Sequence, residues 1–221
     1  MKKNLNTQEK FWQGNFGNSY IGRSKHKSII KNNFYFFKKV FRKRKIKSLI
    51  ELGPNVGNNI IALNKLYNNL KISAVEINKK ACGYLKKIKN VKVFNDSILE
   101  FNTEDRFDLV LIKGVMIHVH PKNLKKLYKT IDKLAKKYIL ICEYYNPYPI
   151  SISYRGHKNK LFKNDYAGEF LKLYKNYKLI DQGFNYHLDK YPLDDSNWFL
   201  LKKLRKKNEK KISKTYLYYS R

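Results

Sequence analysis

Ser48-Leu49-Ile50-Glu51-Leu52-Gly53-Pro54-Asn55-Val56-Gly57-Asn58-Asn59 is the stretch that decides the fold. Its apolar run at 49–52 predicts a buried strand, and the apolar residues after Asn59 recur at helical spacing. Gly53 and Gly57 predict a turn where a ligand approaches the backbone, because a Cβ would block that approach. The following helix start offers free N–H groups. A strand, a glycine-containing turn and a helix form half of a nucleotide-binding βαβ unit, although the third glycine of the dinucleotide pattern is missing.

Outward from this stretch, strand-like apolar runs alternate with helical patterns. Strands are predicted at 47–52, 71–77, 91–95, 107–112 and 138–143. Helices are predicted at 25–42, 58–67, 79–88 and 122–136. This alternation predicts an α/β fold: a Rossmann-like, mostly parallel sheet with helices on both faces. Two later strands at 177–186 and 197–204, which suit an antiparallel pair, bring the sheet to seven strands, and a helix is predicted at 165–174.

Three segments depart from this rhythm. Residues 5–24 mix Phe11, Trp12 and other aromatic residues with glycines, which predicts an irregular segment that folds over a site as a lid or packs on the surface. Residues 144–160 contain Pro147 and Pro149 and predict a long functional loop. The lysine-rich end predicts a loosely ordered tail. We therefore expect an N-terminal arm over 1–26, one domain over 27–204 and a basic tail over 205–221.

Composition narrows the class of protein. The chain has 221 residues, 43% of them hydrophobic and 15% aromatic, which excludes wholesale disorder. It has no apolar run long enough to span a membrane and no signal-peptide pattern at its start, so we expect a cytoplasmic protein. Cys82 and Cys142 are expected to be buried free thiols, and no metal site is expected.

The net charge of +31 invites a nucleic-acid interpretation. However, 41 of the 48 basic residues are Lys and only 7 are Arg, and they are spread along the chain. A surface that recognises phosphates more often uses Arg, whose guanidinium binds them in a bidentate way. We therefore expect no dedicated nucleic-acid partner, although the charge favours acidic small substrates.

Acidic and hydroxyl residues follow the second and third predicted strands. Glu76 closes the second strand, 19 positions after Gly57, where a βαβ unit places the carboxylate that accepts hydrogen bonds from ribose hydroxyls. A helix-capping carboxylate is the alternative. Asp96 and Ser97 follow the third strand and suit an adenine edge or an ordinary turn.

Together these motifs resemble the class I S-adenosylmethionine-dependent methyltransferases over about residues 27–145. Residues 51–57 resemble the first motif of that family, Glu76 its ribose ligand, 95–97 its adenine-side loop, and 107–115 its fourth strand. The resemblance implies S-adenosyl-L-methionine as cofactor. It also implies a set of cofactor-binding residues: Glu51, Gly53, Asn55, Gly57, Glu76, Asp96, Ser97, Lys113 and Gly114.

A closer resemblance, over most of the chain, is to the pseudaminic acid biosynthesis-associated methylases. It rests on residues 11–20, 114–121, 144–147, 153–157, 161–163, 165–169 and 194–199. It implies a bacterial cytoplasmic enzyme encoded among genes for nonulosonic acid sugars of flagellar or surface glycans. We therefore predict O-methylation, with N-methylation as the alternative, of a nonulosonic acid or its nucleotide-activated form. The acceptor would then be a small acidic sugar. This chain departs from the family at Gly22 and in its lysine-rich tail.

Two histidines are candidate catalytic bases for removing a proton from the acceptor. His118 follows the fourth strand, beside the expected methyl position, and titrates near neutral pH; a structural histidine is the alternative. His157 in the long loop is the second candidate.

The substrate-binding candidates lie in the same loop and at the end of the fifth strand. Arg155 suits a bidentate contact with the carboxylate of an acidic sugar, or a surface ion pair. Tyr145 and Tyr154 suit stacking on the sugar or plain packing, and Glu143 suits binding of substrate hydroxyls.

Three other functions compete with this interpretation. An RNA methyltransferase would concentrate basic charge on the face of the active site, and no Asn-Pro-Pro-Tyr motif is present. A non-catalytic binding module would keep the fold without binding the cofactor. A nicotinamide-dependent dehydrogenase is disfavoured by the Glu-x-Gly-x-x-x-Gly spacing and by the lack of a second nucleotide-binding half.

Overall fold

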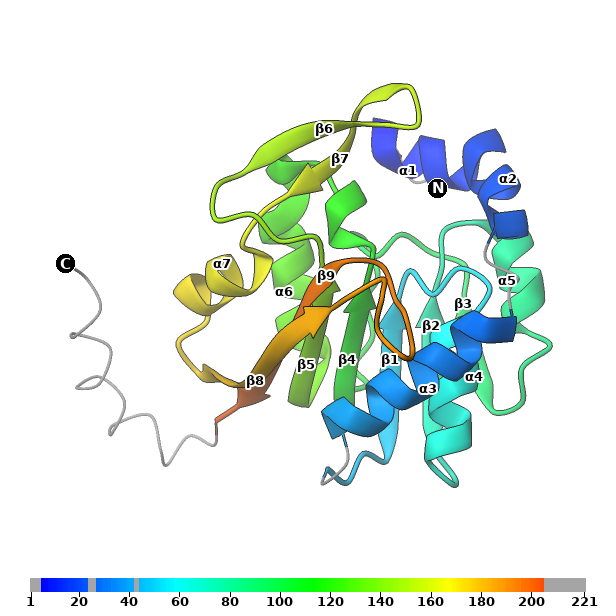
Figure 1. The fold of residues 1–221 in the computed structure, drawn as a ribbon, viewed down its shortest axis with the longest axis vertical. Coiled ribbons are helices and arrows are strands. Elements are labelled where there is room, and N and C mark those ends of the chain that lie inside the picture. The colour runs from blue at the N-terminus through cyan, green and yellow to red at the C-terminus, as the bar shows by residue number, and fades with distance from the viewer. Residues whose placement is uncertain (1–4, 24–26, 42–43, 205–221) are drawn as a thin grey trace.

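A computed structural model describes residues 5–23, 27–41 and 44–204. A seven-stranded sheet in the order β3-β2-β1-β4-β5-β9-β8 forms its centre (Figure 1). The five strands from β1 to β5 run parallel, and β8 and β9 are antiparallel to their neighbours. The bounds are β1 (Ser48–Leu52), β2 (Lys71–Val75), β3 (Val91–Phe94), β4 (Phe107–Lys113), β5 (Ala135–Glu143), β8 (Tyr177–Asn185) and β9 (Ser196–Lys203). The predicted sheet is confirmed, including the antiparallel pair at its end.

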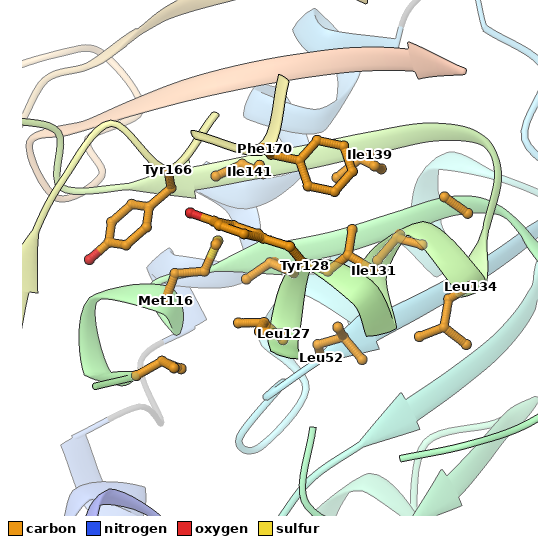
Figure 2. Packing of buried hydrophobic residues seen from close by; sticks show 14 of the residues in the cluster. Leu52, Met116, Leu127, Tyr128, Ile131, Leu134, Ile139, Ile141, Tyr166 and Phe170 are labelled. Carbon is orange, nitrogen blue, oxygen red and sulfur yellow. The ribbon is translucent and has the colours of Figure 1, made fainter. Parts of the chain in front are cut away.

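Helices cover both faces of the sheet because its central strands are apolar on both sides. One face packs against α3 (Lys27–Phe41), α4 (Asn58–Leu66) and α5 (Lys79–Leu85). The other packs against α6 (Leu124–Leu134) and α7 (Tyr166–Leu173). Successive residues of a strand point to opposite faces, so Leu49 joins the α3–α4 side and Ile50 the α6–α7 side. Figure 2 shows the second core, where Tyr128 and Phe170 lie among the strand residues.

The strand register brings the predicted site motifs to one edge. Leu52 pairs with Val75, and Glu51 pairs with Leu111. The residues that follow β1, β2 and β4 therefore meet at the carboxyl edge of the sheet. In open α/β sheets this edge is where ligands bind.

The prediction of a loop at 144–160 is wrong for its second part. Residues 150–163 form an antiparallel hairpin of β6 (Ile150–Tyr154) and β7 (His157–Lys163). Arg155 and Gly156 make its turn, both with positive φ. The two prolines precede the hairpin, and the alternation Ile-Ser-Ile-Ser-Tyr, which is typical of a strand, is the signal that the loop prediction overlooked.

The irregular segment predicted at 5–24 is also wrong, because it forms two short helices, α1 (Thr7–Gln13) and α2 (Asn15–Arg23). Asn6 caps α1 in a capping box with Glu9. Gly14 ends α1, as expected of a glycine within this segment. A Cβ at Gly17 would lie 1.8 Å from the carbonyl oxygen of Trp12, so the tight turn between the helices needs glycine there.

The predicted helix at 25–42 is confirmed as α3, apart from its ends at 25–26 and 42, which lie outside the described residues. The predicted tail at 205–221 lies outside them as well. Within the ranges that the structure covers, no helix has the length and apolar character needed to cross a bilayer. Cys82 and Cys142 are free and buried.

Candidate functional site

A pocket opens at the carboxyl ends of β1, β2 and β4, with an empty volume of about 890 Å³ including its mouth. We call the residues after the strands the strand-end wall; its principal members are Gly53, Asn55, Glu76, Ser97 and Gly114. Residues of the N-terminal segment form the opposite side, the helical wall: Asn6, Gln8, Glu9, Trp12, Gly17 and Tyr20.

Glu76 lies in the strand-end wall, where the βαβ pattern predicts it. Its Oε2 accepts a hydrogen bond from the Asn55 N–H at 2.9 Å, and its Oε1 accepts one from the Asn78 N–H at 2.8 Å. Burial raises the pKa of this carboxyl, while the backbone donors partly oppose the rise. Each carboxylate oxygen has a second lone pair, so the group can still accept a bond from a ligand hydroxyl.

Two of the predicted glycines line the pocket in left-handed conformations. Gly53 has a φ of +73°, and a Cβ there would lie 2.7 Å from the Val115 side chain. Gly114 has a φ of +68° and nothing within 4 Å of the place a Cβ would take. Asn55, which lies between Gly53 and Gly57 in the first motif, also has a positive φ and lines the pocket. The turn therefore brings backbone to the pocket surface, as the sequence predicts.

Gly57, a member of the predicted binding set, is placed differently from Gly53 and Gly114. It is outside the pocket lining, and its φ of +86° lets it begin α4. A Cβ there would meet the side chains of Ile88 and Leu85 at 2.5 and 2.8 Å. This glycine therefore serves the packing of the turn against the end of α5.

Glu51 and Lys113 lie behind the pocket and not on its surface. The buried Glu51 carboxylate accepts a 2.6 Å bond from Asn59 Nδ2 through Oε1, and its Oε2 has no hydrogen-bond partner among the described residues. Burial raises the pKa of Glu51 to about 7, and the charge of Lys113 opposes the rise. Neither residue reaches the pocket in this conformation.

Glu143 has a structural role that differs from the predicted contact with substrate hydroxyls. Its carboxylate accepts backbone N–H bonds from Val115 and Met116 at 2.9 and 3.0 Å and a longer one from Ile117 at 3.4 Å. Burial raises its pKa to about 7. The three donors begin the 3₁₀ helix η1 (Met116–His118), so Glu143 fixes the loop that carries Gly114. Its oxygens are occupied by backbone and only 3% of the residue is exposed.

Asp96 and Ser97 are placed differently from each other. Ser97 lines the pocket, and its hydroxyl donates to Glu9 of α1. Asp96 does not line the pocket, and its Oδ1 accepts the Ser97 N–H at 2.7 Å. The adenine-side loop predicted from the sequence is therefore in contact with the N-terminal helices.

His118 lines the pocket at the end of η1 and is the better placed of the two histidine candidates. Its Nδ1 lies 2.7 Å from the carbonyl oxygen of Lys160. A carbonyl only accepts, so Nδ1 carries the hydrogen and Nε2 is left as a proton acceptor. Burial lowers the pKa of His118 to about 4, with the Lys160 carbonyl opposing the shift, and the ring is therefore neutral at pH 7.

The other acceptor-side candidates are not all brought together. Tyr154 lies beside His118, with ring centroids 4.9 Å apart, whereas Tyr145 packs on Phe199 on the outside. His157 is exposed, and its ring packs on Phe11 and Phe16. Arg155 is exposed at the hairpin turn, with its guanidinium 5.6 Å from the Tyr154 ring centroid. None of these four residues lines the pocket.

Sequence reasoning missed Asn78 and the individual roles of Trp12 and Tyr20. Trp12 lies 4.5 Å from His118 between ring centroids, and its buried Nε1 finds no acceptor within the described part of the chain. Burial raises the pKa of Tyr20, and the neighbouring Tyr154 adds to the rise. The aromatic stretch at 11–20 signals such a cluster, but only the fold shows which rings face the pocket.

Comparison with solved structures identifies the fold. A Burkholderia thailandensis 1,6-didemethyltoxoflavin-N1-methyltransferase with bound S-adenosylhomocysteine superposes with a TM-score of 0.66 at 14% identity, over 93% of this chain and 94% of the other. The plantazolicin methyltransferase BpumL in complex with S-adenosylhomocysteine gives 0.63 at 10% identity, over 90% and 94%. This is the class I methyltransferase fold. A Clostridium acetobutylicum S-adenosylmethionine-dependent methyltransferase gives 0.59 at 12% identity, over 86% and 100%.

Neither a family model nor a curated protein matches the sequence. At these identities the likeness shows the class I methyltransferase fold alone. In this chain two elements outside the seven-stranded sheet and its covering helices form one side of the pocket or lie beside it: the helices α1 and α2, and the β6–β7 hairpin. Figure 1 shows both above the carboxyl edge of the sheet.

Proposed function

We propose that the protein is an S-adenosylmethionine-dependent methyltransferase that acts on a small molecule. The observation that carries the proposal is the position of Glu76, which is buried in the strand-end wall after β2, next to the turn after β1 that holds Gly53. A carboxylate after the second strand of such a sheet suits a ribose diol. The class I fold and the neighbours whose structures contain S-adenosylhomocysteine support the same cofactor.

The cofactor would supply an electrophilic methyl group, and this chain's residues would position the acceptor and remove its proton. Ser97 and the backbone near Gly53 and Gly114 would hold the two ends of the cofactor on either side of Glu76. His118 Nε2 would accept the proton as the acceptor atom attacks, since Nδ1 is held by the Lys160 carbonyl. Catalysis would then depend mainly on alignment of the reacting atoms.

The pocket favours a small acceptor over RNA. Of the described residues that line it, none is Lys or Arg, although the chain carries a net charge of +31. The helical wall further covers the pocket, which suits a compact molecule. Three different enzymes among the fold neighbours are described as N-methyltransferases, which supports nitrogen as an alternative acceptor atom to oxygen.

For the acceptor itself we propose a nonulosonic acid or its nucleotide-activated form, with a carboxylate that stays near the mouth beside Arg155. The support is the sequence resemblance together with the position of the Arg155 guanidinium over Tyr154, whose ring adjoins His118. The reacting end would enter among Trp12, Tyr20 and His118.

Two measurements test the proposal separately. Calorimetry should detect binding of S-adenosylhomocysteine, with Glu76→Ala weakening it about a hundredfold because a buried charge-assisted bond is lost. Equal binding by this variant would contradict the site. A radioactive methyl-transfer assay should then show transfer to a nonulosonic acid. Transfer to RNA and to no such sugar would refute the acceptor class while leaving the cofactor site intact.

A further inference from the structure

Asn78 connects the strand-end wall with the helical wall through one buried side chain. It is 4% exposed and follows β2 by three residues. Its Oδ1 accepts the Ala81 N–H at 2.9 Å and so caps α5. Its Nδ2 lies 3.0 Å from the Trp12 carbonyl oxygen, 3.0 Å from Asn18 Oδ1 and, more weakly, 3.4 Å from the Gln13 carbonyl oxygen.

These contacts provide hydrogen-bond partners for backbone groups at two helix ends, the start of α5 and the end of α1. The last carbonyl groups of α1 have no partner within the helix, and Asn78 Nδ2 donates to them. Its own backbone N–H donates to Glu76 Oε1 at 2.8 Å. One residue therefore touches both the proposed ribose ligand and the junction between α1 and α2.

A second contact repeats this connection at the other end of α1. Glu9 completes the capping box of α1 by accepting the Asn6 N–H at 2.8 Å, and its other oxygen accepts the Ser97 hydroxyl. Both anchors of α1 are thus in the loops after β2 and β3, on either side of the proposed cofactor. The position of Trp12, which faces His118, depends on these loops.

We propose that Asn78 is a positioning residue that couples occupancy of the Glu76 site to the placement of α1 and α2, so that the acceptor side of the pocket is completed only after the cofactor binds. The inference rests on the proposed function, because it takes Glu76 as the ribose ligand. Cofactor binding orders the Glu76–Asn78 turn, Asn78 holds the end of α1, and Trp12 then lies against His118. Acceptor binding follows cofactor binding.

The test uses the full chain labelled with 5-fluorotryptophan. The two tryptophans give two ¹⁹F resonances, one from Trp12 and one from Trp198, which is buried in the α3 core and serves as an internal reference. Saturating S-adenosylhomocysteine should shift the Trp12 resonance and leave that of Trp198 unchanged. Asn78→Ser keeps an oxygen to cap α5 and removes the Nδ2 donor. It should abolish the Trp12 shift at saturation and weaken binding about tenfold, a size typical of coupled sites.

Asn64→Ser is the matched control, because Asn64 Nδ2 also donates to a backbone carbonyl, that of Lys89, but on α4. It should behave as the parent protein. The same Trp12 shift in Asn78→Ser as in the parent, or no shift in a parent that binds the ligand, would overturn the coupling and leave the proposed function standing. A parent that binds neither S-adenosylhomocysteine nor S-adenosylmethionine would instead refute the proposed function. If Asn78→Ser does not fold, Asn78→Asp, which also caps α5, replaces it with the same two outcomes.

Discussion

The strand-end wall and the helical wall of the pocket are held by different kinds of contact. In the strand-end wall, Glu76 accepts backbone N–H groups from Asn55 and Asn78, and Glu143, behind it, fixes the loop after β4. In the helical wall, aromatic rings pack on one another, as Trp12 and Tyr20 do at 5.3 Å between centroids. Buried charge-assisted bonds have strict geometry, whereas ring packing tolerates small shifts. The first wall is therefore suited to an invariant ligand and the second to a variable or moving one.

The two walls also differ in how far apart their partners lie in the sequence. Glu76 and Asn55 are 21 positions apart, within one βαβ unit. The helical wall reaches the hairpin across 151 positions, from Gln8 Nε2 to the Asn159 carbonyl at 3.0 Å. Lys160 Nζ approaches the Thr7 carbonyl at 3.3 Å. A segment that few such contacts hold opens more easily than the central strands.

The largest expected effect is at His118, where the two walls meet. His118→Asn keeps a nitrogen donor near the Lys160 carbonyl and removes the Nε2 base, so kcat should fall about a thousandfold, roughly 4 kcal/mol of activation free energy. In the parent the base is active when unprotonated. Because the pKa of His118 is lowered to about 4, the acidic limb of the kcat/KM profile should lie near pH 4 and not near 6.5.

His187→Asn is the control, since His187 is exposed and pairs with Asp195 away from the pocket. Its rate should match the parent. Full activity in His118→Asn would show that another group removes the proton, and a parent profile with an acidic limb near pH 6.5 would show that burial does not lower the pKa of the base.

The second-largest effect is expected on the free energy of unfolding, through the Glu143 carboxylate behind the strand-end wall. Burial raises the pKa of Glu143 from 4.5 to about 7, so between these values the folded state binds more protons than the unfolded state. The contribution of this carboxyl to the free energy of unfolding is therefore largest below pH 4.5. It is lost as the pH rises through 7, a change of about 3 kcal/mol in total.

Glu143→Gln should remove this contribution, which urea unfolding at pH 5 and pH 8 can measure. The loss of stability between the two pH values should be smaller in the variant than in the parent. Glu51→Gln should show a similar flattening, because the pKa of Glu51 is also raised to about 7. An unchanged difference in Glu143→Gln would mean that the carboxylate is already ionised and well solvated in the folded state.

The sequence predicts the strand-end wall better than it predicts the helical wall. Glu76 is found from spacing alone, because a βαβ unit places its partners within about thirty residues. Glu143 is also found at its strand end, but its hydrogen bonds from the backbone were not predicted, since the donors at 115–117 come from a 3₁₀ turn that has no sequence signature. Trp12 and Asn78 meet across 66 positions, and no local pattern encodes that contact. The hairpin is the exception, because its period-two alternation was visible.

A smaller effect is expected in the helical wall. Gly17→Ala places a Cβ 1.8 Å from the Trp12 carbonyl oxygen, so α1 and α2 must separate. We expect S-adenosylhomocysteine to bind about tenfold more weakly, which is about 1.4 kcal/mol, as measured by calorimetry.

Gly22→Ala lies on the same helix, where a Cβ would meet nothing within 4 Å. It should leave binding unchanged and stabilise α2 slightly, because alanine favours the helix more than glycine does. If Gly17→Ala also bound normally, the helical wall would make no contribution to the affinity of the cofactor.

The smallest effect is expected at Arg155, outside both walls. Its guanidinium is exposed at the hairpin turn, and exposed ion pairs contribute less than about 1 kcal/mol. Arg155→Ala should therefore raise the KM for a carboxylate-bearing acceptor about threefold, with kcat unchanged. Lys158→Ala, an exposed cation in the same hairpin, is the control. The difference between the two variants should shrink as salt is added, because ions screen exposed charges. An equal effect of both variants would assign the contribution to the general positive field and not to a defined carboxylate contact, and would leave aromatic packing at Trp12 and Tyr20 as the source of acceptor specificity.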